Sequence, residues 1–434
     1  MGAVIPAKIL GLEGQVIKQV VFNEETGRVR VICGRDRRRR PVDRRSGRRG
    51  GVHRLLRRTV LDVPLGGHPC EVEIEYAETF LSPGQVRVEE LRFVSPKARV
   101  TKRYARLIAG MARHMPLSTV ARHTGLSWDS VKAIEGAHLT ETIDPPRPQS
   151  LTGIRRLGVD EVARAKGQSY FTLVYDLSEG SNYGRILWVK EGSDSVVLLE
   201  FLNALSQECA AGIEAVAMDM GPAYIAAVRQ SLPHAALVFD RFHVMQMFSK
   251  VIRDCRRAEF KAAKTLGDLT GQRAIKGSLW LLLSNRTTLN ETDQGRLDQL
   301  LHQNQPLATL YTLKEQLQRL WQPNSTQAAM AARLDDWCGI ATAAKIAGLA
   351  AFVKILVGHR TGICAYADHP ITTSRIEAGN VSIALLRRRA RGFRDTDYFK
   401  LKILQLNTED TPSFLHSTWL TPRRQSGIST VGKP

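Results

Sequence analysis

The order of short apolar runs between residues 157 and 240 constrains the fold more than any other feature of the chain. Three runs with strand character come first, and helical and extended patterns then alternate. Consecutive strands form an antiparallel meander, whereas strands joined by helices add in parallel. The order therefore predicts a mixed α/β sheet in which the first and fourth strands are neighbours. The expected strands are Leu157–Asp160, Tyr170–Tyr175, Ile186–Val189, Ala215–Asp219 and Ala236–Asp240, and the expected helices are Ser195–Gln207 and Ala223–Ser231.

The pattern after these strands is almost entirely helical. Apolar residues recur with helical spacing from Phe242 to about Arg360, and a long helix is expected over Thr373–Arg391. The most apolar stretch, Gly339–Gly358, contains two lysines and indicates a buried helix, not a membrane span. Together with the strand order, this pattern predicts an RNase H-like (retroviral integrase-like) α/β core with a large all-α insertion.

The N-terminal part of the chain has a different pattern. Residues 1–95 alternate apolar and polar positions in short runs, which is typical of small antiparallel strands. A dense arginine stretch, Arg28 to Arg58, interrupts them, and so many like charges indicate a segment that orders only on a phosphate backbone. The Pro-rich linker Asp144–Pro148 separates this part from the core. The expected domains are a basic β-rich region at 1–95, a helix-turn-helix at 100–140, the first part of the core at 151–242, the all-helical insertion at 243–368, the C-terminal helix of the core at 369–410 and a flexible tail at 411–434.

The charge balance indicates a nucleic-acid partner. The chain has 62 Lys and Arg against 42 Asp and Glu, a formal net charge of +20. Each phosphate neutralised by a basic side chain releases condensed counterions, although a basic surface that binds nothing is the alternative. Six scattered cysteines without a CxxC pair indicate a reducing compartment. With no signal-peptide pattern at the N-terminus, we expect a cytoplasmic protein with neither a membrane nor a small-molecule substrate as partner.

A helix-turn-helix pattern occupies residues 117–135, which read LSTVARHTGLSWDSVKAIE. Ala121, Gly125 and Val131 supply the small residue at the helix crossing, the turn residue that tolerates positive φ and the apolar anchor of the second helix. Ser127 is a suitable N-cap for that helix. The pattern predicts a DNA-binding helix-turn-helix, with an ordinary helical hairpin as the alternative. The residues expected to meet base edges, at the exposed start of the second helix, are Trp128, Asp129, Ser130 and Lys132.

Carboxylates end two of the expected strands. Asp160 ends the first strand and Asp219 the fourth, so both should lie at one edge of the sheet, and Glu377 lies in the first turns of the late helix. Two divalent ions about 4 Å apart can activate the attacking oxygen and stabilise the leaving oxygen in phosphodiester chemistry, and Mg²⁺ prefers carboxylate ligands. A turn or cap role is the alternative for each single aspartate. Glu161 and Asp176 are the nearest rivals of Asp160, and Glu161 should point to the opposite face of the sheet.

Four sequence blocks follow one another in the order LGVDEVARAKG, AMDMGPAYIAAV, VFDRFHVMQ and TTSRIEAGNVSIALLRRRARGFRDTDYFKLKI. They resemble the successive blocks of insertion-sequence DDE transposases of the ISL3 family, and the resemblance covers nearly all of residues 100–405. It implies that Asp160, Asp219 and Glu377 are the catalytic triad and the ligands of two Mg²⁺ or Mn²⁺ ions. It also implies DNA strand cleavage and transfer at terminal inverted repeats, in an assembly of at least two subunits.

Further residues near these blocks are secondary candidates. Asp240 and His243, in FDRFH, match a D-x-x-H element of several transposases with helical insertions, where the histidine could orient a phosphate or a carboxylate. The alternative is a structural pair with Asp240 as an N-cap. Arginines beside a scissile phosphate are expected to hold the DNA backbone, although a charge run is usually a solvated face. The arginines expected to contact DNA are Arg37, Arg38, Arg39, Arg40, Arg375, Arg387, Arg388 and Arg389.

The N-terminal region departs from the family pattern. Relatives commonly begin with a zinc ribbon on two CxxC pairs, and here the region is at most a degenerate ribbon. Cys33 and Cys70 could form a four-ligand site with His53 and His68, but spacing this irregular argues against zinc. Two other functions remain open. One is a non-catalytic DNA-binding protein, such as a repressor or an inactive transposase remnant, and the other is an RNase H-fold nuclease without strand transfer.

Overall fold

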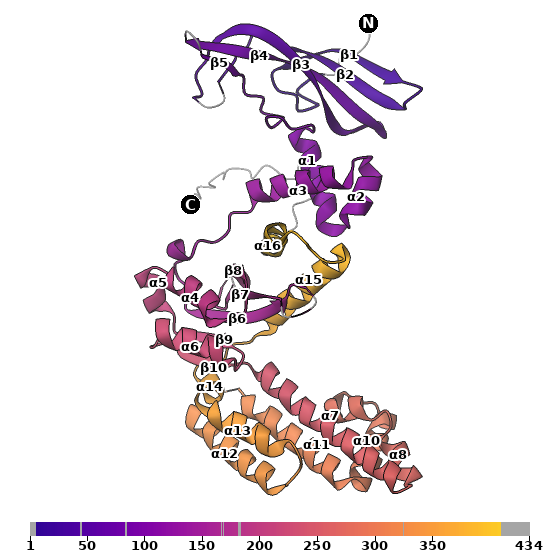
Figure 1. Ribbon diagram of the computed structural model, residues 1–434, viewed down its shortest axis with the longest axis vertical. Coiled ribbons are helices and arrows are strands. Elements are labelled where there is room, and N and C mark those ends of the chain that lie inside the picture. The colour runs from indigo at the N-terminus through magenta and orange to yellow at the C-terminus, as the bar shows by residue number, and fades with distance from the viewer. Residues whose placement is uncertain are drawn as a thin grey trace, which may run out of the picture. The chain divides into compact units, whose positions relative to one another are not determined.

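The computed structural model describes residues 6–43, 46–82, 85–165, 167, 169–180, 184–323 and 325–408 (Figure 1). The chain divides into two compact units, one of Met1–Asp144 and Thr408–Pro434 and the other of Pro145–Asn407. The tail expected to be flexible, 411–434, lies outside the described residues. No helix in the described part is both long and apolar enough to cross a membrane.

A five-stranded sheet begins the first unit. Its order is β1-β2-β4-β3, with β5 paired to β4. The β2–β4 pair is parallel and the other pairs are antiparallel. Alternating apolar side chains of these strands, with the segments that flank them, form one core, as the pattern of residues 1–95 predicts. The strands are β1 (Gln15–Asn23), β2 (Arg28–Arg35), β3 (Gly51–Leu65), β4 (His68–Ser82) and β5 (Gln85–Val88).

The two ends of the arginine stretch are part of this sheet, so the prediction that the stretch orders only on a phosphate backbone is wrong for Arg28–Arg35 and for the arginines of β3. β2 and β3 carry many of the arginines, and glutamates of β4 pair with them across the sheet. Arg28 and Arg30 both pair with Glu71, for example. The alternating glutamates of residues 71–78 thus supply countercharges that the arginine run lacks on its own. Residues 37–40 differ, because these four arginines are exposed in the connection after β2.

Three helices follow the sheet in the first unit: α1 (Lys102–His114), α2 (Leu117–Thr124) and α3 (Trp128–Thr142). Gly125 adopts a φ of +69° between α2 and α3, which a residue without a Cβ tolerates. The side chain of Ser127 accepts a hydrogen bond from the backbone N–H of Ser130 and caps α3. Val120 and Val131 are buried where the helices meet. The predicted helix-turn-helix is therefore confirmed.

The second unit is built on a five-stranded sheet of order β10-β9-β6-β7-β8. The strands β6, β7 and β8 form an antiparallel meander, and β9 and β10 add to β6 in parallel. The predicted meander and the predicted pairing of the first and fourth strands are confirmed. The strands are β6 (Arg156–Ala163), β7 (Tyr170–Asp176), β8 (Arg185–Glu191), β9 (Ala215–Met218) and β10 (Ala236–Phe239).

Helices cover both faces of this sheet. On one face, Val159 and Val174 share an apolar core with α4 (Ser195–Asn203) and α6 (Pro222–Ser231). On the other face lies α15 (Ser374–Ala390), which is the late helix predicted from the sequence. The prediction of one helix over Ser195–Gln207 is wrong at its C-terminal end. A separate helix, α5 (Gln207–Gly212), begins there because the Ser206 side chain accepts a hydrogen bond from the backbone N–H of Cys209.

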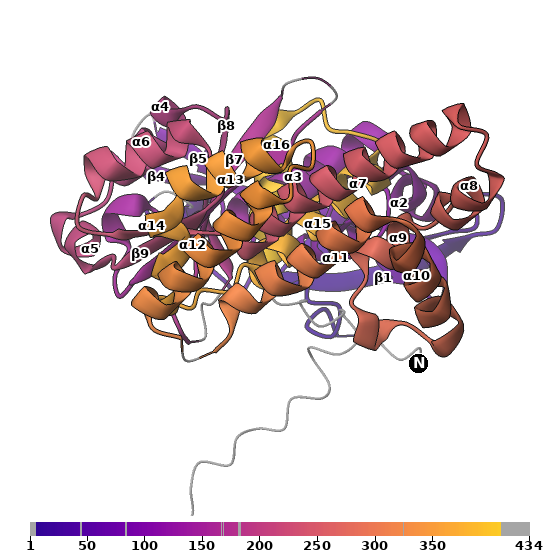
Figure 2. The same cartoon turned by 90° about the horizontal axis from the view of Figure 1, so that it is seen from below.

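Between β10 and α15 the described residues form helices and no strand. These helices continue the apolar core of the sheet, and α12 and α13 lie side by side (Figures 1 and 2). The expected single helix over Gly339–Gly358 is wrong, because Gly348, with a φ of +87°, separates α12 from α13. The helices are α7 (Arg241–Thr265), α8 (Leu269–Ile275), α9 (Leu279–Leu283), α10 (Glu291–Gln303), α11 (Gln305–Gln318), α12 (Gln327–Ala343), α13 (Leu349–Gly358) and α14 (Arg360–Cys364), and α16 (Thr396–Leu404) follows α15.

Candidate active site

Three acidic side chains from separate elements line one pocket of the second unit. Asp160 lies in β6, Asp219 directly follows β9 and Glu377 lies in the first turn of α15. The pocket has a volume of about 150 Å³. Because β6 and β9 pair in parallel with Gly158 opposite Ala217, the same register carries Asp160 and Asp219 to one edge of the sheet. The structure thus brings together the three residues that the sequence singled out.

Two glycines allow α15 to approach the sheet closely enough for this arrangement. A Cβ at Gly158 would lie 2.6 Å from Cδ1 of Ile376, and a Cβ at Gly379 would lie 2.9 Å from the hydroxyl oxygen of Tyr175. Either atom would overlap its neighbour, because interiors are close-packed and have few voids. The glycine positions therefore set how near the helix that carries Glu377 lies to β6 and β7.

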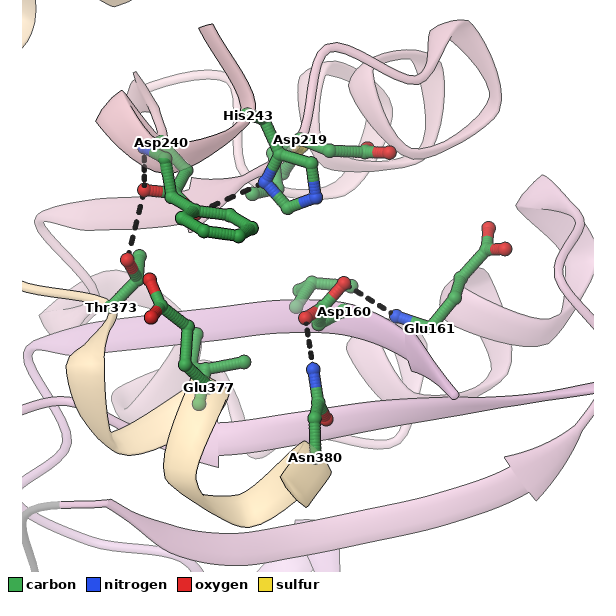
Figure 3. A pocket seen from close by; sticks show the side chains of 12 residues that line it. Asp160, Glu161, Asp219, Asp240, His243, Thr373, Glu377 and Asn380 are labelled. Carbon is green, nitrogen blue, oxygen red and sulfur yellow. Dashed lines mark hydrogen bonds and ion pairs between the residues drawn. The ribbon is translucent and has the colours of Figure 1, made fainter. Parts of the chain in front are cut away.

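A hydrogen-bond network orients Asp160. One of its carboxylate oxygens accepts a hydrogen bond of 2.6 Å from the side-chain amide of Asn380, and the other accepts one of 2.8 Å from the backbone N–H of Glu161. The hydroxyl of the buried Tyr175 donates to the amide oxygen of Asn380 at 3.3 Å. Burial raises the pKa of Asp160, and the hydrogen bonds from Glu161 and Asn380 oppose the rise. Figure 3 shows Asn380 reaching Asp160 from α15.

Glu377 and Asp219 occupy other sides of the pocket. Burial raises the pKa of Glu377, and the negative charge of Asp240 adds to the rise. Asp219 accepts a hydrogen bond of 2.9 Å from the backbone N–H of Gly221, a contact that fixes the turn between β9 and α6. The carboxyl groups of Asp219 and Glu377 point to different sides of the pocket in Figure 3. Asp219 therefore has the turn role expected of a single aspartate in addition to its place in the pocket.

Asp240 and His243 form a pair at the start of α7. Asp240 is the N-cap of this helix and accepts hydrogen bonds from the backbone N–H of Phe242 at 2.9 Å and from the hydroxyl of Thr373 at 2.8 Å. His243 contacts the other oxygen of Asp240 through Nδ1 at 3.0 Å. That hydrogen bond raises the pKa of His243 despite its burial. Asp240 therefore has the N-cap role expected of a structural pair, and both Asp240 and His243 line the pocket.

The chemical type of the pocket's oxygen ligands suits a hard divalent cation. Asp160, Asp219 and Glu377 offer carboxylate oxygens, which Mg²⁺ and Mn²⁺ prefer. Burial raises the pKa of Asp160 and the negative charge of Asp219 adds to the rise, so a bound cation would favour the charged forms of these carboxylates. As they stand, however, no three His, Cys, Asp or Glu side chains among the described residues are grouped closely enough to hold a metal ion.

The two cysteines and two histidines considered for zinc have different surroundings in the first sheet. Cys33 and Cys70 are buried in the apolar core of the first sheet, and burial raises the pKa of Cys33 to about 12 and that of Cys70 to about 11. His53 lies beside Glu78, and the ring of His68 packs edge-on against Phe22. Among the described residues these four side chains do not form a group that could hold a metal ion.

The residues expected to contact DNA are placed in two environments. In the first unit, Trp128 is exposed at the start of α3, and Lys132 lies over its ring with its amino group 6.0 Å from the ring centre. Ser130 shares a hydrogen bond of 2.8 Å with the hydroxyl of Ser127, so it belongs to the helix cap. In the second unit, Arg375 and Arg388 are exposed on α15 and Arg389 is partly buried there. Arg387 donates to the backbone carbonyl of Ala163 and so also fastens α15 to β6.

The two rivals of Asp160 are placed differently. Glu161 contacts Tyr224 of α6, on the face of the sheet opposite α15, as the alternation along β6 predicts, although it also borders the pocket. Asp176 accepts a hydrogen bond from the backbone N–H of Ser178 and does not line the pocket. Asn380 was not singled out from the sequence. Its signal is the spacing Glu377-Ala-Gly-Asn380, because residues three apart share a helix face.

Comparison with known proteins identifies the class of protein. Residues 157–403 match a family model described as a transposase, and residues 89–135 match the helix-turn-helix domain of transposase family ISL3. The chain is 33% identical over 396 residues to the transposase for insertion sequence element IS1001 of Bordetella parapertussis, covering 91% of this chain and 95% of that protein. It is 26% identical over 306 residues to the transposase for insertion sequence element IS1557 of Mycobacterium tuberculosis, covering 66% of this chain and 67% of that protein.

These matches define the chain as a DNA-processing enzyme with a helix-turn-helix DNA-binding domain. It belongs to the ISL3 family of insertion-sequence transposases, as its sequence blocks predict.

Proposed function

We propose that this transposase binds the terminal inverted repeats of an insertion sequence, cuts one DNA strand at each end and joins the freed 3′-hydroxyl to target DNA. The observation that carries the proposal is the meeting of Asp160, Asp219 and Glu377, from three elements far apart in the chain, around one pocket. The named relatives are transposases of insertion sequence elements. Because two ends must be processed together, we further propose an assembly of at least two subunits on DNA, acting in the cytoplasm.

The proposed core is RNase H-like. An antiparallel meander of β6, β7 and β8, extended in parallel by β9 and β10, supports this assignment, as does the position of the carboxylates at one edge of the sheet. The helices α7 to α14 would then be the all-α insertion at 243–368, and α15 the helix that returns the last acidic residue to the core at 369–410. In the first unit we propose a basic β-rich region at 1–95 and the helix-turn-helix domain at 100–140.

The chemistry proposed for the site assigns a role to each side chain. Asp160, Asp219 and Glu377 would hold two Mg²⁺ or Mn²⁺ ions, which when bound supply an activated oxygen nucleophile and a stabilised leaving oxygen. Asn380 keeps the carboxylate of Asp160 turned into the pocket. His243, whose contact with Asp240 favours its charged form, can orient a phosphate oxygen. No covalent enzyme intermediate is needed.

DNA binding is proposed for the helix-turn-helix and for two groups of arginines. Trp128 and Lys132 lie at the start of α3, where a recognition helix meets base edges and phosphates. The arginines proposed to hold the DNA backbone are Arg37, Arg38, Arg39 and Arg40 of the first unit and Arg375, Arg387, Arg388 and Arg389 of α15.

A first prediction concerns Lys132. Lys132→Ala is expected to weaken binding to element-end DNA. The negative slope of log affinity against log salt should become less steep by about 1, because one phosphate contact and its counterion release are lost. Fluorescence anisotropy at a series of salt concentrations measures both quantities. A slope equal to that of the wild-type protein would show that Lys132 contacts no phosphate.

The experiment that tests the proposed function uses full-length protein, a donor duplex with the element end and supercoiled target DNA in Mg²⁺. We expect nicked donor and a joined donor–target product on a denaturing gel. Cleavage without a joined product would favour the nuclease without strand transfer. Specific binding without cleavage in either Mg²⁺ or Mn²⁺ would favour the non-catalytic DNA-binding protein.

A second prediction concerns Asn380. Asn380→Ala is expected to slow nicking by about ten- to a hundredfold and to raise the Mg²⁺ concentration needed for half-maximal activity, because groups that orient metal ligands have effects of this size. Ser382→Ala is the matched control, since its hydroxyl donates only to the carbonyl of Ala378 in the same helix. If Asn380→Ala keeps the wild-type Mg²⁺ dependence, the amide does not position Asp160.

A further inference from the structure

The pocket has an exposed aromatic ring at its border. Phe242 lines the pocket together with the three carboxylates, yet 47% of its surface is exposed. By contrast, Phe248 of the same helix and Phe201 of α4 are fully buried. The exposed part of this ring lies at the border of the pocket, so it is accessible to a ligand that occupies the pocket.

The backbone at Phe242 is held firmly. Phe242 begins a 25-residue helix, and its backbone N–H donates to Asp240 at 2.9 Å. The same oxygen of Asp240 accepts a hydrogen bond from Thr373, the N-cap of α15. The start of α7 is thereby joined to the start of the helix that carries Glu377. The ring of Phe242 also packs edge-on against His243, with 5.8 Å between ring centres. The exposed ring is therefore placed by a rigid support and not by a loop.

A cation lies next to the ring in sequence. The exposed Arg241 places its guanidinium over the ring of Trp321, 5.8 Å from the ring centre. Aromatic rings and cations in succession are the features on which unpaired nucleotides bind, because each base offers an apolar face and each nucleotide a phosphate. The carboxylates of the same pocket are the groups proposed to act on a phosphodiester. The chemistry at this border thus matches a nucleotide adjoining the bond that is cut.

We propose that Phe242 is a nucleobase subsite, on which a base of the element end stacks after leaving the DNA duplex beside the scissile phosphate. The inference rests on the proposed function and adds a positioning role to it. A base held outside the duplex fixes the backbone next to it, so the scissile phosphate is presented to the pocket in one orientation. Stacking on a ring face is tolerant of base identity, so the subsite contributes position and not sequence recognition.

The test compares Phe242→Ala, Phe242→Leu and Phe242→Trp in the full-length protein. Nicking is measured on donor duplexes that carry one abasic site at each nucleotide flanking the cleavage position in turn. Phe242→Ala and Phe242→Leu are expected to slow nicking of intact duplex by about ten- to a hundredfold, the range of base–aromatic stacking, while Phe242→Trp stays near the wild-type rate. An abasic site at one position should restore most of the lost rate, because no base then has to leave the stack.

Trp280→Ala is the matched control, because Trp280 of α9 is 46% exposed and does not line the pocket, and it should nick at the wild-type rate. Wild-type rates for Phe242→Ala would overturn the subsite while leaving the proposed function in place. So would slow nicking that no abasic position restores, since a packing defect gives that result. If the wild-type protein itself does not nick in Mg²⁺ or Mn²⁺, the proposed function fails, and the subsite fails with it.

Discussion

Asp219→Asn is expected to abolish nicking of element-end DNA, with a loss of about a thousandfold or more. The amide is nearly isosteric with the carboxylate, and its oxygen can still accept the hydrogen bond from the backbone N–H of Gly221 that fixes the turn after β9. The change therefore removes a negative oxygen donor from the pocket and little else. Losing one ligand of a divalent ion removes several kcal/mol of transition-state stabilisation, and each 1.36 kcal/mol is a factor of ten in rate.

The variant is measured on a denaturing gel under single-turnover conditions, with DNA affinity measured in parallel. Affinity should stay close to that of the wild-type protein, because the helix-turn-helix belongs to a different compact unit. Asp254→Asn is the matched control, since Asp254 is exposed on α7 and pairs only with Arg257 one turn away. Asp219→Asn protein that nicks and joins DNA at the wild-type rate would contradict the assignment of this residue.

Glu89→Ala is expected to destabilise the first sheet by about 3–5 kcal/mol. Glu89 and Arg35 are both buried, and the carboxylate accepts hydrogen bonds from the Arg35 guanidinium at 2.9 Å and from the backbone N–H of Ala77 at 2.8 Å. Removing one partner leaves an uncompensated charge in the interior, and this arrangement costs several kcal/mol. Hydrogen exchange of the full-length protein, followed by mass spectrometry of peptides from β2 and β4, reports the local free energy of opening.

Glu71→Ala is the control for this prediction. Its partners Arg28 and Arg30 are about half exposed, so water can solvate them when the carboxylate is removed. The cost should therefore stay below about 1 kcal/mol. Equal protection losses for the two variants would show that the Arg35–Glu89 pair is solvated in solution and is no more important than a surface pair.

The sequence predicted the features that depend on local pattern. Strand order came from the alternation of apolar runs, and the parallel neighbours β6 and β9 followed from the crossover rules. The helix-turn-helix was predictable because Gly125 and Ser127 each have one local task, a positive φ and an N-cap. Asp160 and Asp219 could be paired because their strands were expected to be neighbours. The prediction that Asp160 ends the first strand is wrong, since β6 continues to Ala163 along its partner β7.

Features that depend on contacts distant in the sequence were not predicted. The arginines of β2 and β3 are held by carboxylates such as Glu71, and only the sheet register shows which glutamate faces which arginine. The contact of Asn380 with Asp160 joins residues 220 positions apart. It also requires the close approach of α15 at Gly379. An expected helix is interrupted at Ser206, because the side chain of this residue caps a new helix there.

Titration of Mn²⁺ into the full-length protein bound to donor DNA, followed by calorimetry, tests the central claim most directly. Asp160, Asp219 and Glu377 are expected to hold two ions per chain, and Asp160→Asn, Asp219→Asn and Glu377→Gln should each weaken or remove at least one of them. If all three variants bind Mn²⁺ with the stoichiometry and affinity of the wild-type protein, these carboxylates do not form the metal centre.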